Sequence, residues 1–500
     1  MKEKRIFEAL TYVDEKYIDE AKTRKLKRYI LSWKKYATIA ACTLLFIGGS
    51  LLLIDLFPIG GSSGSGGSGH GDGNTFMSYA GPVFPLTLSQ NDDDIISNRN
   101  IAFDFPLPDY ESIRVWGGNI VDSYSLSNYS DQEKIIKAIY PFSGSFDDLK
   151  KLMPVIKLDG ETISPSLYPG SYSGDFTGVY GGEDPDGSEN IRQLDSWEGY
   201  KDLLKDGSYK NNAFLPSPIL SQEVIIYKFT DFEAPGEYDA ATQAISFTID
   251  PDKTTVFSYG FNGFEADEEG FRRYSYFVPN KQGMQRDPKF LILLGEDISD
   301  YSLEGYKNGA TEKGNELDGV SARITREEEV LSNIMKKLID SHLAHFDENL
   351  HSVSKEMFLG ALSEFMYKYG LLSDSVRDRY QYGVIDDLIN ETRILQRVFY
   401  LEFEITIPAK GETTIIADMH KAPSHDFACS GSDKVNIQGY DMVTRLGSNL
   451  NFNKQSAELI SSDQIEIVRE NFGFDLSKGI TKVELDPSNE HYYLEIRPIK

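Results

Sequence analysis

The sequence predicts an α+β protein that is mostly β: a single transmembrane helix followed by an extracellular region of β-sandwich-like domains with a helical insertion. Three observations lead to this prediction: an uncharged apolar run near the N-terminus, apolar–polar alternation in the later regions, and helical periodicity between those regions. The predicted divisions are a cytoplasmic amphipathic tail (1–36), a transmembrane helix (37–57), a Gly/Ser linker (58–75), a first β-rich region (76–325), a helical segment (326–396) and a C-terminal β-rich region (397–500).

The tail has one apolar stripe at helical spacing. Its members, which we predict to bind a partner, are Ile6, Leu10, Val13 and Tyr17, flanked by Phe7 and Ile18. A tail of this length cannot bury the stripe by itself. The stripe can be covered by a partner protein, by the inner membrane surface or by another copy of the tail. Acidic residues within 3–20 argue against the membrane surface, where a basic polar face is expected. A tail that only fixes the membrane topology is the remaining alternative.

The transmembrane prediction rests on Ala37–Ile54, which is 18 residues long and carries no charge. A helix rises about 1.5 Å per residue, so this run would span roughly 27 Å. The hydrocarbon layer of a bilayer is about 30 Å thick. Trp33 and Tyr36 precede the run and Phe57 follows it, as expected of aromatic rings at a lipid–water boundary. The alternative is a buried core helix, which usually has a polar edge that this run lacks.

The distribution of basic residues sets the predicted orientation. Between Lys22 and Lys35 there are seven basic residues and no acidic one, and no Lys or Arg follows the run until Arg99. Basic residues stay in the cytoplasm, so we predict a single-pass cell-membrane protein with its N-terminus cytoplasmic and its C-terminus extracellular. Small residues in the run, such as Gly48 and Gly49, make a homodimer through the span a candidate assembly.

The acidity of the chain belongs to the predicted outer part. Residues 1–55 hold 11 basic and 7 acidic side chains, so the rest, with 40 basic and 71 acidic ones, carries a formal charge of −31. Such a surface repels nucleic acid and favours basic partners or divalent cations. The two cysteines, Cys42 in the predicted span and Cys429 outside, cannot pair with each other. An exported chain without a disulfide framework indicates a Gram-positive bacterium.

Local patterns predict the elements of the first β-rich region. Asn100–Pro106 alternates apolar and polar residues, as a half-buried strand does. The pair at Asp159–Gly160 predicts a hairpin, and Asp250–Lys253 predicts a tight turn between two strands. Residues 164–220 are predicted to form long loops with one short helix near Trp197–Leu204.

Three helices are predicted in the helical segment. Thr325 and Glu328 have the spacing of a capping box, which predicts the start of the first helix. Ser354 is the predicted N-cap of the second helix. The third is predicted to run from about Asp374 to Gln396.

We predict no catalytic residue, no metal site and no cofactor, and hence no enzyme. His342 and His345 have helical spacing, with His351 nearby, but His342 lies on the apolar face, where a core histidine is the commoner interpretation. A second group, predicted to lie in one loop, consists of Asp418, His420, His425 and Asp426. Glu183–Gly187 lacks the terminal Glu of a calcium loop, and the sequence leaves calcium binding open.

Two stretches at the N-terminus carry a resemblance to a known class. The sequence IFEALTYVDEKYIDEA (6–21), followed by a basic stretch and WKKYATIAACTLL (33–45), resembles single-pass membrane anti-sigma-factor-like proteins of clostridia and related bacteria. GYDMVTRLGSNLNF (439–452) and QIEIVRENFGFDL (464–476) are similar to the ends of the same proteins, whose extracellular domain is uncharacterised. The resemblance implies that the tail holds an extracytoplasmic-function sigma factor. The tail has no His and no Cys, so it departs from the zinc-binding class of these proteins.

Two functions remain open at this point. The first is a membrane regulator whose tail binds a sigma factor and whose extracellular domain senses or binds something outside. The second is a surface-anchored binding or structural protein without a signalling role. A membrane-tethered hydrolase is a weaker third hypothesis, because the GxSxG string occurs only inside the Gly/Ser linker.

Overall fold

The computed structural model describes these residues: 79–106, 117–172, 174–176, 191–193, 197–205, 208–236, 240–279, 287–307, 309, 311–344, 353–368, 371–372, 376, 379, 383–426, 434 and 436–499. Strand makes up 49% of the structure and helix 16%, which confirms the mostly β prediction. None of the helices within those ranges is long and apolar enough to cross a membrane. The predicted span at 37–57 lies outside them.

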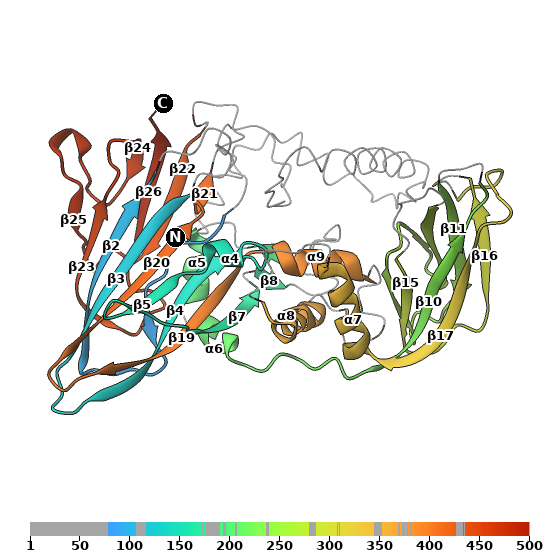
Figure 1. Ribbon diagram of the computed structural model, residues 1–500, viewed down its shortest axis with the longest axis horizontal. Coiled ribbons are helices and arrows are strands. Elements are labelled where there is room, and N and C mark those ends of the chain that lie inside the picture. The colour runs from blue at the N-terminus through green and yellow to red at the C-terminus, as the bar shows by residue number, and fades with distance from the viewer. Residues whose placement is uncertain are drawn as a thin grey trace, which may run out of the picture. The chain divides into compact units, whose positions relative to one another are not determined.

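In a group of three sheets, two combine strands from both ends of the chain and the other consists of C-terminal strands alone (Figure 1). The first has the order β25 (Lys482–Glu484), β23 (Asn451–Leu459), β2 (Ile95–Asp104), β3 (Gly118–Asn128), β20 (Glu412–Lys421), β5 (Val155–Leu158) and β6 (Glu161–Thr162). The second is β21 (His425–Asp426), β22 (Gln438–Val443), β26 (His491–Pro498) and β24 (Ile465–Glu470). The third is β1 (Thr87–Leu88), β4 (Lys134–Gly144), β19 (Arg397–Ile407) and β7 (Ser166–Tyr172).

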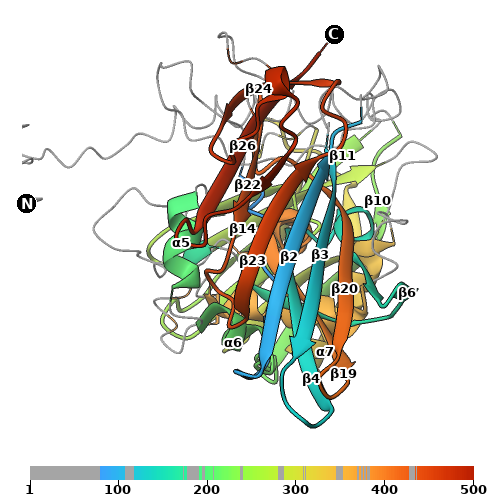
Figure 2. The ribbon, with the colours of Figure 1, turned by 90° about the vertical axis from the view of Figure 1, so that its left-hand side faces the viewer.

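Strands before and after the helical segment pair directly. β3 pairs with β20 and β4 with β19, both antiparallel, whereas β2 and β23 run parallel. Figure 2 shows β23, β2, β3 and β20 side by side. Every second residue of β2 is buried, which is the alternation that predicted this strand.

Residues between these strands form a second pair of sheets. One sheet has the order β17 (Ser321–Val330), β10 (Glu223–Glu233), β15 (Lys289–Leu294), β12 (Thr255–Tyr259) and β18 (Gly383–Val384). The other is β13 (Gly263–Ala266), β14 (Phe271–Pro279), β11 (Ala240–Thr248) and β16 (Tyr301–Tyr306). One apolar cluster draws side chains from both sheets, among them Phe229, Ile245 and Tyr276. This arrangement agrees with the predicted sandwich-like architecture.

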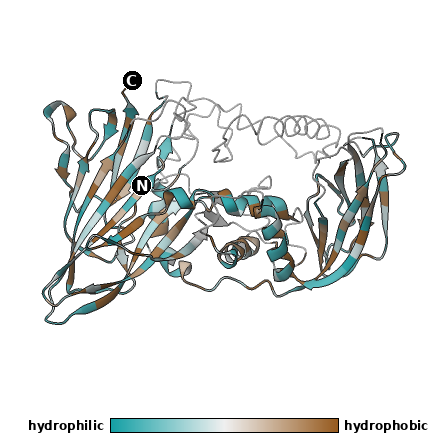
Figure 3. Cartoon of the chain, in the orientation of Figure 1, coloured by the Kyte–Doolittle hydropathy of each residue, from teal (hydrophilic) through white to brown (hydrophobic). Residues whose placement is uncertain are grey.

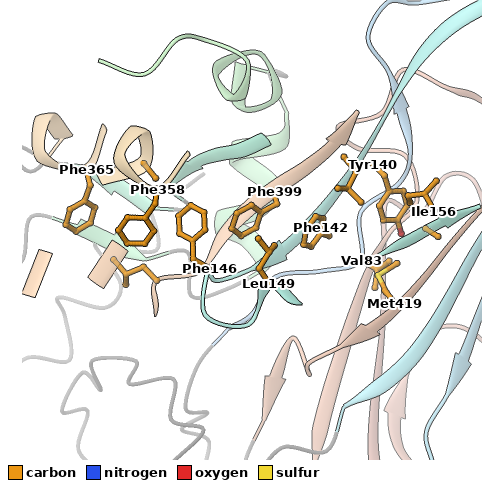
Figure 4. Packing of buried hydrophobic residues seen from close by; sticks show 14 of the residues in the cluster. Val83, Tyr140, Phe142, Phe146, Leu149, Ile156, Phe358, Phe365, Phe399 and Met419 are labelled. Atoms are coloured by element: carbon orange, nitrogen blue, oxygen red, sulfur yellow. The ribbon is translucent and has the colours of Figure 1, made fainter. Parts of the chain in front are cut away.

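Helices connect the two groups of sheets through a continuous core. They are α7 (Leu331–Leu343), α8 (Lys355–Lys368) and α9 (Ile385–Ile394). α8 contacts β7 and α9 contacts β12. Phe146 joins the parts, because its ring centroid lies 5.3 Å from that of Phe358 on α8 and 5.2 Å from that of Phe399 on β19 (Figure 4). The apolar residues that make this core alternate with polar ones along the strands (Figure 3).

The remaining elements are short. They are α4 (Leu149–Leu152), α5 (Trp197–Leu204), α6 (Ser208–Ala213), the 3₁₀ helix η5 (Leu476–Lys478), and the paired strands β8 (Gly174–Phe176) and β9 (Ile191–Gln193). The helix predicted near Trp197 is therefore confirmed as α5.

Several turn and cap predictions are confirmed. Asp159 and Gly160 have φ values of 46° and 89° and join β5 to β6 as a hairpin. Asp250–Lys253 forms the turn between β11 and β12. The hydroxyl of Ser354 accepts a hydrogen bond from the Met357 N–H at 3.1 Å, which caps α8.

Two helix starts were predicted wrongly. Thr325 and Glu328 lie in β17, where they pair with Lys228 and Ile225 of β10, and the helix begins only at Leu331. The ladder with β10 outweighs a local capping signal, because it satisfies the backbone groups of the whole strand. The third helix begins at Ile385, since the two residues before it form β18 and pair with β12.

Candidate functional site

Most side chains singled out in the sequence are not placed by the structure. Outside the described residues lie the six predicted partner-binding side chains (Ile6, Phe7, Leu10, Val13, Tyr17 and Ile18), and also His345, His351, Cys429 and Glu183–Gly187. Their predicted roles stay predictions.

The two histidine groups differ in their surroundings. His342 Nε2 lies 3.0 Å from Asn390 Oδ1, and its ring meets Tyr259 edge-on, as expected of a histidine on the packed face of a helix. His420 and His425 do not share a loop, because His420 belongs to β20 and His425 to β21. Within the described ranges, no three His, Cys, Asp or Glu residues are arranged to hold a metal ion.

His425 belongs instead to a cluster of ionisable side chains around Asp441. We call it the Asp441 cluster, and its members are Tyr79, His425, Asp441, Arg469, His491 and Glu495. The sheet order β21-β22-β26-β24 brings the other five residues together, and Tyr79 joins them through an isolated β-bridge to His425. His491 and Glu495 are four residues apart on β26, so their side chains share one face of the sheet.

A glycine on β22 makes room for His425. Gly439 pairs with His425 on one side and with Glu495 on the other. A Cβ atom at Gly439 would lie 2.1 Å from two atoms of the His425 ring. The ring therefore lies over Gly439, and its Nε2 is 3.5 Å from Glu495 Oε1.

Asp441 is the centre of the cluster, with a side chain only 5% exposed. Tyr79 donates its hydroxyl to Asp441 Oδ2 at 2.6 Å, and His491 Nε2 lies 2.8 Å from Asp441 Oδ1. His425 Nδ1 is 3.9 Å from Oδ2. Burial alone would raise the pKa of the Asp441 carboxyl, but the hydrogen bonds from His491 and Tyr79 hold this pKa below its ordinary value. Asp441 is therefore ionised at neutral pH.

Glu495 is the second carboxylate of the cluster. Arg469 donates to it through Nη2 at 2.6 Å and through Nε at 3.1 Å, a bidentate pair. Burial would raise the pKa of Glu495, but His425 and Arg469 lower this pKa to about 2. On the other side of the cluster, Trp197 of α5 stacks on His491 with ring centroids 4.1 Å apart and planes 11° apart.

The cluster holds the first residues that the structure describes, Tyr79–Val83, which we call the docked segment. The Ala80 N–H donates to Ser424 O and the Val83 N–H to Asp441 O, both at 2.8 Å. The Ala80 carbonyl accepts from Lys421 Nζ at 3.1 Å. In the sequence, three residues separate the docked segment from the predicted Gly/Ser linker (58–75).

Lys421 is an unusual neighbour of the docked segment, because it is only 6% exposed. Its amine donates to the carbonyls of Ala80 and Ala422, each at 3.1 Å. Burial lowers the pKa of this amine to about 7, although Asp441 raises it in part. The folded protein therefore binds this proton far more weakly than the unfolded chain does.

We expect Lys421 to make stability rise with pH above neutrality. Because the pKa of this amine is lowered on folding, its destabilising effect is complete below about pH 7 and disappears toward pH 10.5. Between pH 7.5 and 9 the free energy of unfolding of the wild type should gain about 1 kcal/mol per pH unit relative to Lys421→Met. Denaturant unfolding of both proteins across this range measures the difference.

The control for this prediction is Lys336→Met, since Lys336 is exposed on α7. Its unfolding midpoint should follow the wild type at every pH. Parallel pH profiles for the wild type and Lys421→Met would contradict the prediction.

The sequence showed only one member of the Asp441 cluster as a candidate. His425 stood out as a histidine near acidic residues, but Asp418 instead pairs with Lys157, with Oδ2 and Nζ 3.2 Å apart. Tyr79 and Asp441 are 362 residues apart in the chain. Nothing in the sequence distinguishes Asp441, His491 and Glu495 from other strand residues. Only the sheet order shows that they lie together.

Comparisons with known proteins do not assign the chain to a family. No model of a known protein family matches the chain. No curated protein matches it either.

Proposed function

We propose that the chain is a single-pass membrane regulator. Its cytoplasmic tail binds a partner, an extracytoplasmic-function sigma factor by resemblance, and its outer β-rich part senses or binds something outside the cell. The observation that carries the proposal is the uncharged run Ala37–Ile54, with seven basic residues just before it and none just after it. A tail with an apolar stripe on one side of this run and a large folded part on the other is the expected layout of a transmembrane regulator.

The fold supports the outer half of this proposal. The described residues bury an extensive apolar core in several sheets, so this part of the chain is more than a stalk. The docked segment lies three residues after the predicted linker, so a change at the Asp441 cluster acts close to the end of that linker.

A surface-anchored binding or structural protein is the second candidate. The observation in its favour is the linker Gly60–Asn74, which is made mostly of Gly and Ser. Such a chain behaves as a flexible coil, with a mean end-to-end distance of roughly 20 Å for its length. A flexible coil transmits force poorly, so a regulator built in this way would signal by release or cleavage rather than by a rigid lever.

Capture of sigma factors by the tail tests the proposal. We expect the full-length protein, purified from membranes, to bind an extracytoplasmic-function sigma factor of its own organism in calorimetry. Leu10→Asp should weaken this binding at least tenfold, because it puts a carboxylate into an apolar contact. The matched control is Tyr12→Asp, which adds the same charge on the opposite face of the predicted helix and should bind like the wild type.

Two outcomes count against the regulator. One is the absence of saturable binding to any of these sigma factors, which leaves the surface-anchored protein as the better function. The other is an equal loss of binding in both variants, since the apolar stripe would then not be the contact.

A further inference from the structure

We infer that His425 and His491 form a proton-sensitive clamp: acidification strengthens the hold of the Asp441 cluster on the docked segment. Histidine is the side chain whose charge ordinarily changes between pH 5 and 8. Both histidines face carboxylates that stay ionised in this range, and the carboxylate that they share binds the docked segment.

His491 contributes the shorter contact. Its Nε2 lies 2.8 Å from Asp441 Oδ1. Because Asp441 is ionised, this contact already has one charged partner, and protonation of the ring adds the opposite charge on the donor. Trp197 stacks on the His491 ring, with centroids 4.1 Å apart, and fixes its orientation toward Asp441.

His425 lies between the two carboxylates. Its Nδ1 is 3.9 Å from Asp441 Oδ2 and its Nε2 is 3.5 Å from Glu495 Oε1. When the ring is protonated, both nitrogens carry protons, so each faces an anion. The neutral ring can donate to only one of them.

Other charged groups surround the cluster on every element that packs against it. The titratable groups are Lys421 of β20, Asp426 of β21, Tyr493 of β26, Glu198 and Tyr200 of α5, and the ion pair of Lys201 with Glu490 next to His491. Arg469 binds Glu495 in a bidentate pair, and Lys421 donates to backbone carbonyls.

Protonation of the two histidines affects the docked segment through three contacts. The Tyr79 hydroxyl donates to Asp441 Oδ2, and the Val83 N–H donates to the backbone oxygen of the same residue. The Tyr79 ring stacks beside that of His425, with centroids 6.4 Å apart. A more firmly held Asp441 and His425 thus hold both ends of the segment.

In biological terms, acidity would be a signal that the outer part reads close to the end of the linker. This reading rests on the proposed function, whereas the clamp itself is a property of the folded chain.

Hydrogen–deuterium exchange of the full-length protein tests the clamp. The reporters are the amides of Ala80 and Val83, which donate to Ser424 and Asp441. After correction for the intrinsic rate, we expect their protection to be about fivefold or more higher at pH 5.5 than at pH 7.5. The double variant His425→Gln, His491→Gln should lose this difference, because glutamine does not gain charge.

Two further variants make the test specific. His342→Gln is the matched control, since it replaces a histidine of α7 that bonds to Asn390, and it should keep the full pH difference. Tyr79→Phe removes the hydrogen bond from the docked segment to the Asp441 carboxylate and should both lower protection and reduce the pH difference.

The inference is overturned if the wild type shows no gain in protection at pH 5.5, or if the double variant keeps that gain. Exchange of β2 and β3 in the same samples shows whether each variant is folded. Should the double variant unfold, His491→Gln alone must reduce the gain. Neither tail binding nor membrane topology enters this measurement, so its failure is distinct from failure of the proposed function.

Discussion

Replacing Arg99 by Met is expected to destabilise the protein by about 3–5 kcal/mol, because the substitution leaves a buried charge without its partner. Arg99 donates from Nε and Nη2 to the two carboxylate oxygens of Asp122, each at 2.8 Å, and both side chains are fully buried. Its Nη1 also donates to the Val443 carbonyl at 2.7 Å. The free energy of unfolding, measured from denaturant midpoints of the full-length chain, reports the loss.

Two tyrosines still donate hydrogen bonds to Asp122 in the Arg99→Met variant. Tyr124 and Tyr140 donate their hydroxyls to Asp122 Oδ2 at 2.7 and 3.0 Å. These bonds satisfy one carboxylate oxygen but do not neutralise its charge. The double variant Arg99→Met, Asp122→Leu should therefore recover part of the stability that the single variant loses.

The control for Arg99 is Arg323→Met. Arg323 is 70% exposed and its nearest carboxylate, on Asp231, is 3.7 Å away. This substitution should leave the unfolding midpoint unchanged, as is usual for an exposed ion pair. Equal midpoints for Arg99→Met and the wild type would show that the buried pair does not stabilise the fold.

Replacing Phe146 by Ala has the second large expected effect, a loss of about 3–5 kcal/mol. Phe146 is fully buried, and its ring touches Phe358 of α8 and Phe399 of β19. The guanidinium of Arg397 also lies 4.8 Å from its ring centroid. The truncation would leave a cavity between a helix and a sheet, so two elements lose contacts at once.

Because Phe146 packs between α8 and β19, the loss of stability should be greatest in these two elements. Hydrogen exchange in the variant should speed up in α8 and β19 before it does so in β11 or β14, which pack in a separate apolar cluster. Tyr129→Ala is the control, because Tyr129 is 59% exposed. A uniform increase in exchange over all strands would contradict the expected order.

The sequence predicts local structure better than it predicts partners. Alternation in Asn100–Pro106 indicated a half-buried strand, and the Asp159–Gly160 pair indicated a hairpin, because both signals lie within a few residues. The prediction from Thr325 and Glu328 was wrong because it also used only local spacing. Their spacing fits a capping box, and only the ladder with β10 shows that they belong to a strand.

The sequence does not predict which distant strands pair with each other. Periodicity shows that a strand has a buried face, but it does not say which strand lies beside it. The docked segment meets Asp441 across 362 positions, and nothing near either residue indicates the other. Only His425 of the Asp441 cluster was visible as a candidate, and its actual neighbours, Asp441 and Glu495, come from later strands.

The pairing of strands from both ends of the chain has a consequence for biogenesis. β3 and β4 are made early, but their neighbours β20 and β19 follow more than 250 residues later. Until then, β3 and β4 have unpaired edges, which are sites for pairing with other chains. The inserted sheets, by contrast, complete most of their pairing locally and can fold first. In a nascent chain, the inserted sheets would thus be folded while the sheets of β3 and β4 are still incomplete. Truncation before β19 would yield a product that aggregates.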